Sequence, residues 1–257
     1  MVERVEKSTP EVANIITLLH EKWHDVSLIQ FLHQWEDIFF SGIIIIILAI
    51  IAKMATREKK MVPGKFQNAV EIIVEGLDSF VCSVIGHDGR RYTPFIGTLF
   101  LYIFCMNMLG LIPGMKSPSA NINTTLGLSF SVFLYVQYTG ITRLGLIGYI
   151  DHLLGRPRDL VGFLFIPLMF PLHVLEEFIK PISLALRLFG NVTGEDSLIA
   201  VFLGIGIVIL SFIHSPIGFP LQFPFMLLAV LTGTIQALVF SLLSTVYISM
   251  MLPHEGH

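Results

Sequence analysis

The sequence predicts an all-α integral membrane protein, with about five spanning helices, one amphipathic surface helix and a long tilted helix hairpin at the C-terminus. The first observation is composition, because 54% of the 257 residues are hydrophobic and 14% are charged, whereas soluble domains are about a quarter charged. The second is a series of apolar stretches of about 20 residues, the length at which a helix crosses a bilayer. The third is an alternation of basic and non-basic loops between those stretches, which is typical of multi-pass topology.

Residues 1–37 are predicted to form a polar outer arm, which lacks the early apolar core of a signal peptide. Residues 38–54 form the first span, which must therefore direct its own insertion, and they contain the apolar run Ile43–Ile47. Basic residues beside a span mark its cytoplasmic end. Five basic residues stand at the end of this span or after it, namely Lys53, Arg57, Lys59, Lys60 and Lys65. The N-terminal arm is therefore expected outside.

Residues 55–92 are predicted to be a cytoplasmic loop that contains an amphipathic helix from Phe66 to Ile85. Apolar residues recur there at helical spacing, while Glu71, Glu75 and Asp78 take another face. A helix with so many charges on one side favours the membrane surface over the hydrocarbon core.

Residues 93–162 are predicted to hold two spans with their loops, from Thr93 to Pro113 and from Leu126 to Leu146. The loop between these spans carries a single basic residue, Lys116, which suits the outer side. The next loop suits the cytoplasmic side because it carries Arg143, Arg156 and Arg158.

Residues 163–257 are predicted to form a long tilted helix pair that carries an ion path. The apolar stretch from Phe163 to Met251 is too long for one crossing and is interrupted around His214–Pro220. We expect an outer turn at that interruption and a C-terminus in the cytoplasm. The chain has no internal repeat, which argues against an inverted-repeat transporter.

Arg187 is the first candidate functional residue, because it lies inside this apolar stretch. A guanidinium at membrane depth costs a few kcal/mol or more, so chains rarely carry one without a use. Its side chain keeps its proton at physiological pH, and it therefore cannot carry protons. It can act as a fixed positive charge that a moving negative charge must pass.

Other polar residues share one face of the Arg187 helix. At about 100° per residue, they fall within roughly 80° of one another. Glu176 and Lys180 have the favourable order for a salt bridge at a spacing of four. We call this set the polar stripe, and it comprises His173, Glu176, Lys180, Arg187 and Asn191. An alternative is that Glu176, Glu177 and Lys180 only pair with one another or reach lipid headgroups.

Two adjacent acids, Glu195 and Asp196, follow on the same helix. Asp196 lies about 180° around the helix and roughly 13 Å along its axis from Arg187, so direct pairing is not expected. Two acids in an apolar stretch indicate a water-lined access path. Alternatively, they lie in a break opened by Gly190 and Gly194.

The last helix carries Gln236 and Tyr247 on nearly the same face, because eleven residues make about three turns. Gln236 could hydrogen-bond the guanidinium of Arg187 if the two helices form a hairpin. The alternative is that Gln236 only joins two helices, as buried polar residues do in many membrane proteins.

The arginine segment resembles subunit a of the membrane sector of F-type ATP synthases. The resemblance lies in Lys180-Pro181-Ile182-Ser183-Leu184-Ala185-Leu186-Arg187-Leu188-Phe189-Gly190-Asn191. It is reinforced by Asn107-Met108-Leu109-Gly110-Leu111-Ile112-Pro113, Thr124-Thr125-Leu126, Gln236-Ala237 and Val246-Tyr247-Ile248-Ser249. The order and spacing match from Trp35 to the C-terminus, whereas the N-terminal arm carries no such signal.

The resemblance implies a rotary motor stator in a bacterial plasma (inner) membrane. Its expected partners are a c-subunit ring, peripheral stalk b subunits and the remaining ATP synthase subunits. It implies two proton half-channels that lead to the ring carboxylates, with Arg187 as the charge barrier between them. The residues expected in proton translocation are Arg187, Asn191, Glu195, Asp196, Gln236, Tyr247, Glu176 and His173.

Asp196 matches a family position that lines one half-channel. Some relatives place a histidine opposite it, at the position of Ala229, and His173 stands where an acid is frequent. The partner of Asp196 is therefore open, and so is the channel role of His173.

Two other functions would also fit parts of the sequence. A stand-alone membrane ion transporter would share the buried charges and the spans. His20-Glu21-Lys22-Trp23-His24 is a literal H-E-x-x-H zinc-protease pattern, but it lies in a short arm without a third ligand. We expect no cofactor, metal or nucleic acid, and no nucleotide site because there is no phosphate-binding loop. Cys82 and Cys105 are expected to be reduced packing residues.

Overall fold

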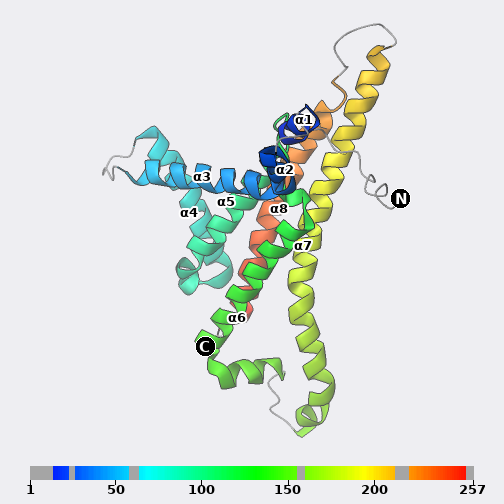
Figure 1. Ribbon diagram of the computed structural model, residues 1–257. Coiled ribbons are helices and arrows are strands. Elements are labelled where there is room, and N and C mark those ends of the chain that lie inside the picture. The colour runs from blue at the N-terminus through cyan, green and yellow to red at the C-terminus, as the bar shows by residue number, and fades with distance from the viewer. Residues whose placement is uncertain (1–13, 23–26, 58–63, 155–159, 212–219, 253–257) are drawn as a thin grey trace. The chain divides into compact units, whose positions relative to one another are not determined.

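The computed structural model describes residues 14–22, 27–57, 64–154, 160–211 and 220–252. All regular elements in these ranges are helical, and no strand occurs among them, which confirms the predicted all-α class (Figure 1). The α-helices are α1 (Ile15–Lys22), α2 (Ser27–Gln34), α3 (Glu36–Thr56), α4 (Lys65–Ile85), α5 (Thr93–Leu109), α6 (Ile122–Leu153), α7 (Leu160–Ser211) and α8 (Phe223–Met250). Two short 3-10 helices, η1 (His87–Arg91) and η2 (Pro118–Ala120), lie between them.

The chain divides into two compact units, which are described separately below. Unit 1 comprises residues 1–61, 101–124 and 188–238, and unit 2 comprises residues 62–100, 125–187 and 239–257. Both α7 and α8 therefore contribute to each unit. The candidate site residues are divided in the same way, with Arg187 at the end of the unit 2 part of α7.

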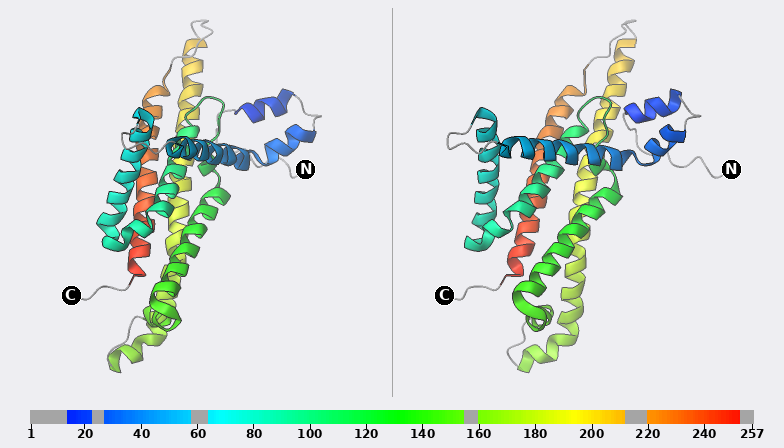
Figure 2. Two further views of the ribbon diagram at one scale, coloured as in Figure 1. Left: turned by 90° about the vertical axis from the view of Figure 1, so that its left-hand side faces the viewer. Right: turned by 60° about the vertical axis from the view of Figure 1, so that its left-hand side comes forward.

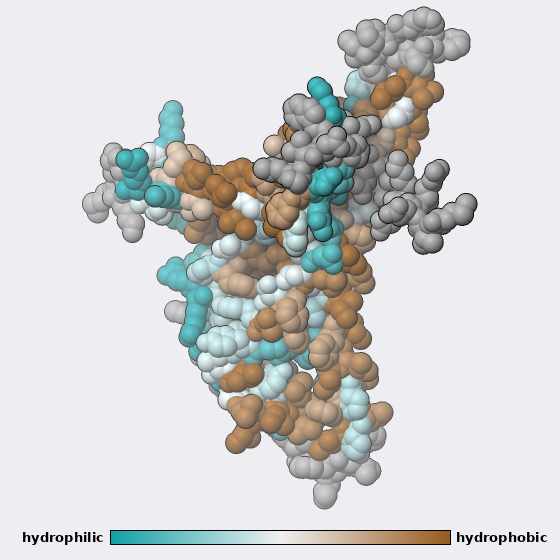
Figure 3. Space-filling model, viewed as in Figure 1, coloured by the Kyte–Doolittle hydropathy of each residue, from teal (hydrophilic) through white to brown (hydrophobic). Residues whose placement is uncertain are grey.

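Three of the described helices are long and apolar enough to cross a membrane, namely α3, Ile166–Ile209 of α7, and α8. Helix α5 is also apolar but has only 17 residues. Figure 3 shows apolar side chains spread over the outer surfaces of α3 and α7, where Ile45, Ile46 and Val208 are among the exposed residues. Such surfaces suit lipid rather than water. The chain is thus a membrane protein, while the number of spans and their orientation stay predictions.

The predicted long helix pair is confirmed as α7, with 52 residues, and α8, with 28 residues. Helix α7 continues through Pro167, Pro171 and Pro181. The expected outer turn falls on residues 212–219, outside the described residues.

In unit 1, the N-terminal arm is partly helical and docks on the loop between α5 and α6. The Ile15 backbone N–H donates to the Gly114 carbonyl at 2.8 Å. Gly114 has a φ of +86°, and a Cβ there would approach Ile15 Cγ1 to 2.8 Å. Only glycine meets both conditions without strain.

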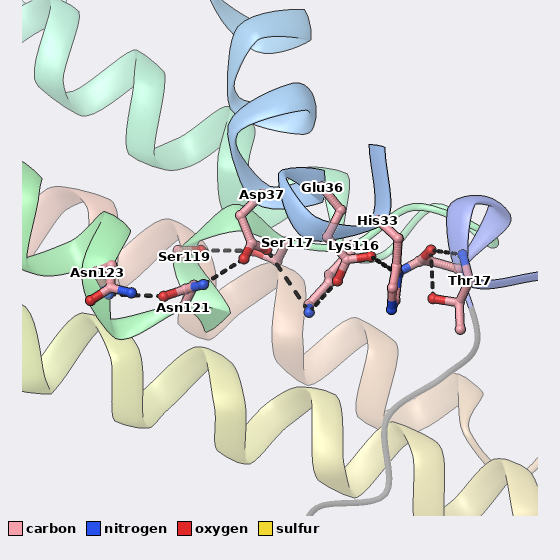
Figure 4. Close-up of polar contacts among 10 residues, drawn as sticks. Thr17, His33, Glu36, Asp37, Lys116, Ser117, Ser119, Asn121 and Asn123 are labelled. Atoms are coloured by element: carbon pink, nitrogen blue, oxygen red, sulfur yellow. Dashed lines mark hydrogen bonds and ion pairs between the residues drawn. The ribbon is translucent and has the colours of Figure 1, made fainter. Parts of the chain in front are cut away.

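A polar cluster in unit 1 joins the arm, the start of α3 and the α5–α6 loop (Figure 4). Lys116 Nζ lies 2.7 Å from Glu36 Oε1, and Asn14 Nδ2 donates to Glu36 Oε2 at 3.2 Å. Asn121 Nδ2 donates to the Asp37 carboxylate. The carboxylate of Glu36 is nearly buried, so these partners replace the water that it loses.

In unit 2, α4 ends at Gly86, whose φ of +90° is rare for other residues. The start of α5 is tied back to α4, because Thr93 Oγ1 donates to Asp78 Oδ1 at 2.7 Å. The Thr93 hydroxyl and the Arg90 guanidinium both stabilise the ionised carboxylate, so the pKa of Asp78 is lowered despite some desolvation. Cys82 and Cys105 are both free thiols, as predicted.

Helix α6 extends beyond the predicted end of the third span, to Leu153. Gly145 interrupts its helical backbone with a φ of +72°, and the chain after it turns aside. Before this break, α6 runs beside the unit 2 part of α7 in both views of Figure 2. Phe133 of α6 and Phe178 of α7 have ring centroids 5.6 Å apart. This α6–α7 contact supports the polar residues described next.

Candidate functional site

Arg187 lies on α7 with an exposed side chain. Among the described residues, no hydrogen bond or ion pair to its guanidinium is found. Its neighbours Leu184, Ala185 and Leu188 are buried, whereas Leu186 is exposed, so one side of α7 is covered by the protein and Arg187 lies on the uncovered side. An exposed, unpaired guanidinium on an apolar helix is available to a group outside this chain.

Lys180 is the centre of a charge cluster in unit 2. Its Nζ lies 2.7 Å from Glu177 Oε1 and 3.3 Å from Glu176 Oε1. It also lies 5.6 Å above the centroid of the Tyr247 ring, within the range of a cation–π contact. The predicted Glu176–Lys180 pair is thus present, but Glu177 is the closer partner.

Residues of α6 hold the Glu177 carboxylate in this position. Its Oε2 accepts a hydrogen bond of 2.9 Å from Gln137 Nε2, and the Tyr149 hydroxyl donates to Gln137 in turn. Glu177 is only 9% exposed, so nearly all of its hydration is replaced by these contacts. The sequence placed Glu177 beside the polar stripe but contained no signal for its partners on α6.

A cavity of about 130 Å³ opens beside this cluster, lined by Leu153, His173, Glu176, Glu177, Lys180 and Met250. At about 30 Å³ per molecule, it has room for roughly four waters. His173 Nδ1 lies 3.2 Å from the Leu153 carbonyl oxygen, which fixes the ring at the wall. The cavity therefore brings together three residues of the predicted stripe, His173, Glu176 and Lys180.

The two neighbouring glutamates differ in burial, and we therefore expect their ion pairs with Lys180 to differ in their contribution to stability. The Glu177 side chain is 11% exposed and that of Glu176 is 50% exposed. Breaking a buried ion pair from one side costs about 3–5 kcal/mol, whereas an exposed pair contributes about 0.2–1 kcal/mol. Glu177→Ala should therefore lower the thermal stability of the detergent-solubilised protein far more than Glu176→Ala. Equal losses in a thermal aggregation assay would contradict this assignment.

In unit 1, Asn191 of α7 and Gln236 of α8 form a direct pair. Asn191 Nδ2 donates to Gln236 Oε1 at 2.8 Å. Gln236 is only 3% exposed, yet its Nε2 has no hydrogen-bond partner among the residues that the structure describes. Two predicted site residues are thus brought together, because Asn191 is the hydrogen-bond partner of Gln236 within unit 1. The buried Nε2 leaves one donor available to an acceptor.

A second contact follows one helical turn further along both helices. The Glu195 carboxyl group lies beside the Thr232 side chain, whose hydroxyl donates to the Leu228 carbonyl of α8 at 2.8 Å. Glu195 lies four residues after Asn191, and Thr232 lies four residues before Gln236. The stacked rings of Phe202 and Phe225, 3.9 Å apart, continue the same antiparallel register. Within unit 1, α7 and α8 are therefore paired face to face, with the polar pairs next to one another.

Thr232 was absent from the predicted site, although its spacing of four from Gln236 was a usable signal. Asp196 points about 100° away from Glu195 around α7, and it has interactions of its own. Of the two acids, Glu195 is the one that faces α8 beside the Asn191–Gln236 pair. Tyr247 lies with Lys180 in unit 2 instead.

Comparison with known proteins decides the family. A family model described as "ATP synthase A chain" matches residues 38–249. The chain belongs to this family. It is 44% identical to ATP synthase subunit a of Protochlamydia amoebophila (strain UWE25), over 99% of this chain and 94% of that protein. It is 39% identical to ATP synthase subunit a of Oleidesulfovibrio alaskensis, over 86% of this chain and 88% of that protein.

These matches confirm the family that the Arg187 motif indicated, and they include bacterial relatives. The matched region holds every candidate residue, from His173 to Tyr247. The family therefore assigns this chain to ATP synthesis and ion transport in the membrane sector of the complex.

The zinc-protease pattern receives no support from the described residues. His20 stacks on His33, with ring centroids 4.7 Å apart, while His24 and the side chain of Glu21 lie outside the described residues. Within the described ranges, no group of three or more His, Cys, Asp or Glu residues could hold a metal ion.

Proposed function

We propose that this chain is the stator ion-channel subunit of an F-type ATP synthase. It would provide two proton half-channels to the carboxylates of a c-subunit ring and couple proton flow to ring rotation. The observation that carries the proposal is the exposed Arg187, which lies on α7 between two groups of polar residues. One group belongs to unit 2 and the other to unit 1.

The chemistry of Arg187 supports a charge barrier. A guanidinium near a carboxyl group favours its ionised form, and it cannot itself pass a proton on. A ring carboxylate that meets Arg187 would therefore release its proton before passing and bind another after it. Because an ionised carboxylate is costly in lipid, the ring turns only when the carboxyl is protonated on its lipid-facing side.

The two polar groups supply candidates for the half-channels. Before Arg187, His173, Glu176 and Lys180 line a cavity with room for water, which suits proton exchange with one side of the membrane. After Arg187, Asn191 is hydrogen-bonded to Gln236, and Glu195 lies beside Thr232 one turn further along. Asp196 and Tyr247 complete the proposed set. Each elementary charge that crosses supplies about 2.3 kcal/mol per 100 mV, which the ring would convert to rotation.

The proposal includes an assembly and a location. The partners are the c ring, the peripheral stalk b subunits and the remaining subunits of the complex. The location is the bacterial inner membrane, with the N-terminus outside and the C-terminus in the cytoplasm. The arrangement of basic residues around α3 supports this orientation.

A stand-alone ion transporter is the second candidate, favoured only by the cavity beside Lys180. The test is proton flux in liposomes under an imposed potential, with the chain alone or with the reconstituted complete membrane sector. We expect flux above the lipid background only with the ring present. Saturable flux through the chain alone would refute the stator role and support the transporter.

A further inference from the structure

A buried hydrogen-bond network at the end of α5 contacts α8 next to the polar pairs of unit 1. Asn107, which is 7% exposed, donates from Nδ2 to the Gly233 carbonyl at 3.0 Å. Its Oδ1 accepts from Ser119 Oγ at 2.8 Å. Ser117 lies 2.7 Å from the Ser119 hydroxyl and donates to the Met106 carbonyl at 2.9 Å. We name Asn107, Ser117, Ser119 and Gly233 the Asn107 network.

This network determines which way the Asn107 amide points. An asparagine amide can be turned over, which exchanges its donor and its acceptor. The Gly233 carbonyl can only accept, so the nitrogen faces α8 and the oxygen is left to accept from the Ser119 hydroxyl. Ser117 and Ser119 are almost fully buried, at 1% and 0% exposure, so water does not compete for these bonds. Part of this chain of serines is visible in Figure 4.

The contact also depends on glycine at position 233. A Cβ there would lie 3.2 Å from Asn107 Cβ and 3.3 Å from Met108 Cε. Ala229 and Ala237, one turn to either side of Gly233, are 4% and 0% exposed. These three small residues form one buried face of α8, and at Gly233 this face packs closely on the end of α5.

The neighbouring face of α8 carries the proposed ion-translocation residues. Gly233 lies about 100° around the helix from Thr232. Thr232 contacts Glu195, and Gln236 contacts Asn191. When α8 is held at Gly233, only one rotation of the helix about its axis points Thr232 and Gln236 toward α7. A rotation by about 50° would turn both side chains away from their partners on α7.

We propose that Asn107 is a positioning residue, which holds the rotation of α8 so that Gln236 and Thr232 face Asn191 and Glu195. This inference rests on the proposed function and adds a residue to it. Both polar groups of the Asn107 amide are already used within the protein. Asn107 therefore acts through α8 and does not itself receive the ion.

The test measures the rotation of α8 and proton pumping in the same assembled complex. Cysteines replace Phe202 and either Phe225 or Met226, in a chain whose native Cys82 and Cys105 are replaced by alanine. Positions 225 and 226 differ by about 100° around α8. The ratio of 202–225 to 202–226 cross-links, measured by mass spectrometry of the peptides, reports the rotation.

Asn107→Leu keeps a similar volume and loses both hydrogen bonds. We expect it to lower the cross-link ratio about fivefold and to lower ATP-driven proton pumping in parallel. Asn123→Leu is the matched control, because the Asn123 side chain is exposed on α6, and it should change neither quantity. Unchanged ratio and pumping in Asn107→Leu would overturn the proposal, and so would lost pumping at an unchanged ratio, which would assign Asn107 to ion conduction.

Asn107→Asp tests the hydrogen bonds through the pH dependence of proton pumping, which would not change if Asn107 only filled space. A protonated carboxyl group can still donate to Gly233 and accept from Ser119, whereas an ionised one has no donor. Pumping by this variant should therefore approach wild type at low pH and decline as the carboxyl ionises. A pH profile identical to that of the wild-type complex would contradict the proposal.

Ser119→Ala covers the case in which Asn107→Leu does not assemble. It leaves Asn107 in place but removes one of the two bonds that hold its amide, so an intermediate cross-link ratio is expected, and an unchanged ratio would again overturn the proposal. The ratio is measured without ATP. The ratio therefore tests the position of α8 independently of the role of Arg187. Failure of the proposed function would be seen separately, in the Arg187 variants.

Discussion

Replacing Arg187 by alanine is expected to abolish ATP-driven proton pumping while the complex stays assembled. The exposed guanidinium makes no hydrogen bond within the described residues, so its removal leaves no partner unsatisfied inside the chain. Without the fixed charge, a ring carboxylate can pass while still protonated, and ATP hydrolysis no longer moves protons. The measurement is acidification of inverted membrane vesicles, with a passive leak through the membrane sector as a second readout.

Two variants sharpen this experiment. Arg187→Lys keeps a positive charge but loses the planar fork that binds a carboxylate through two bonds, so we expect most of the pumping to be lost. Arg91→Ala, at an exposed position in η1, is the matched control and should pump normally. Normal pumping by the Arg187→Ala complex would remove the central residue of the proposed mechanism.

Replacing both acids after Arg187, as Glu195→Gln with Asp196→Asn, is expected to reduce pumping to the level of the Arg187→Ala complex. Either acid can exchange a proton with water, whereas the two amides cannot. The single variants should keep part of the activity because the acids are adjacent. Glu195→Gln should be the more severe of the two, since Glu195 contacts Thr232 beside the Asn191–Gln236 pair.

The same vesicle assay decides this second prediction. ATP hydrolysis and the amount of assembled complex are followed in parallel, so that a loss of pumping is not confused with a loss of protein. Pumping above half of the wild-type rate in the double variant would exclude both acids from the ion path. A larger loss for Asp196→Asn than for Glu195→Gln would assign the main role to the acid that does not face α8.

Helix type and the position of the charged residues were predictable from the sequence, whereas the end of α6 at Leu153 was not. The first span, the amphipathic helix and the C-terminal helix pair all occur where apolar periodicity placed them. These features are local, because they follow from the hydrophobicity and helical spacing of neighbouring residues. The motif around Arg187 was sufficient to indicate the family, since motif recognition needs only residue order.

The partners of the site residues were decided by tertiary structure alone. The periodicity of α7 put Glu176 on the polar stripe, but burial by α6 made Glu177 the closer partner of Lys180. The sequence left open whether Gln236 contacts Arg187 or only joins two helices, and within unit 1 the register of α7 against α8 pairs Gln236 with Asn191. Only packing brings Asn107 to Gly233, 126 positions later in the chain. A helical pattern determines which residues share one face, but the rotation and register of that face depend on close packing with another helix, which no single segment encodes.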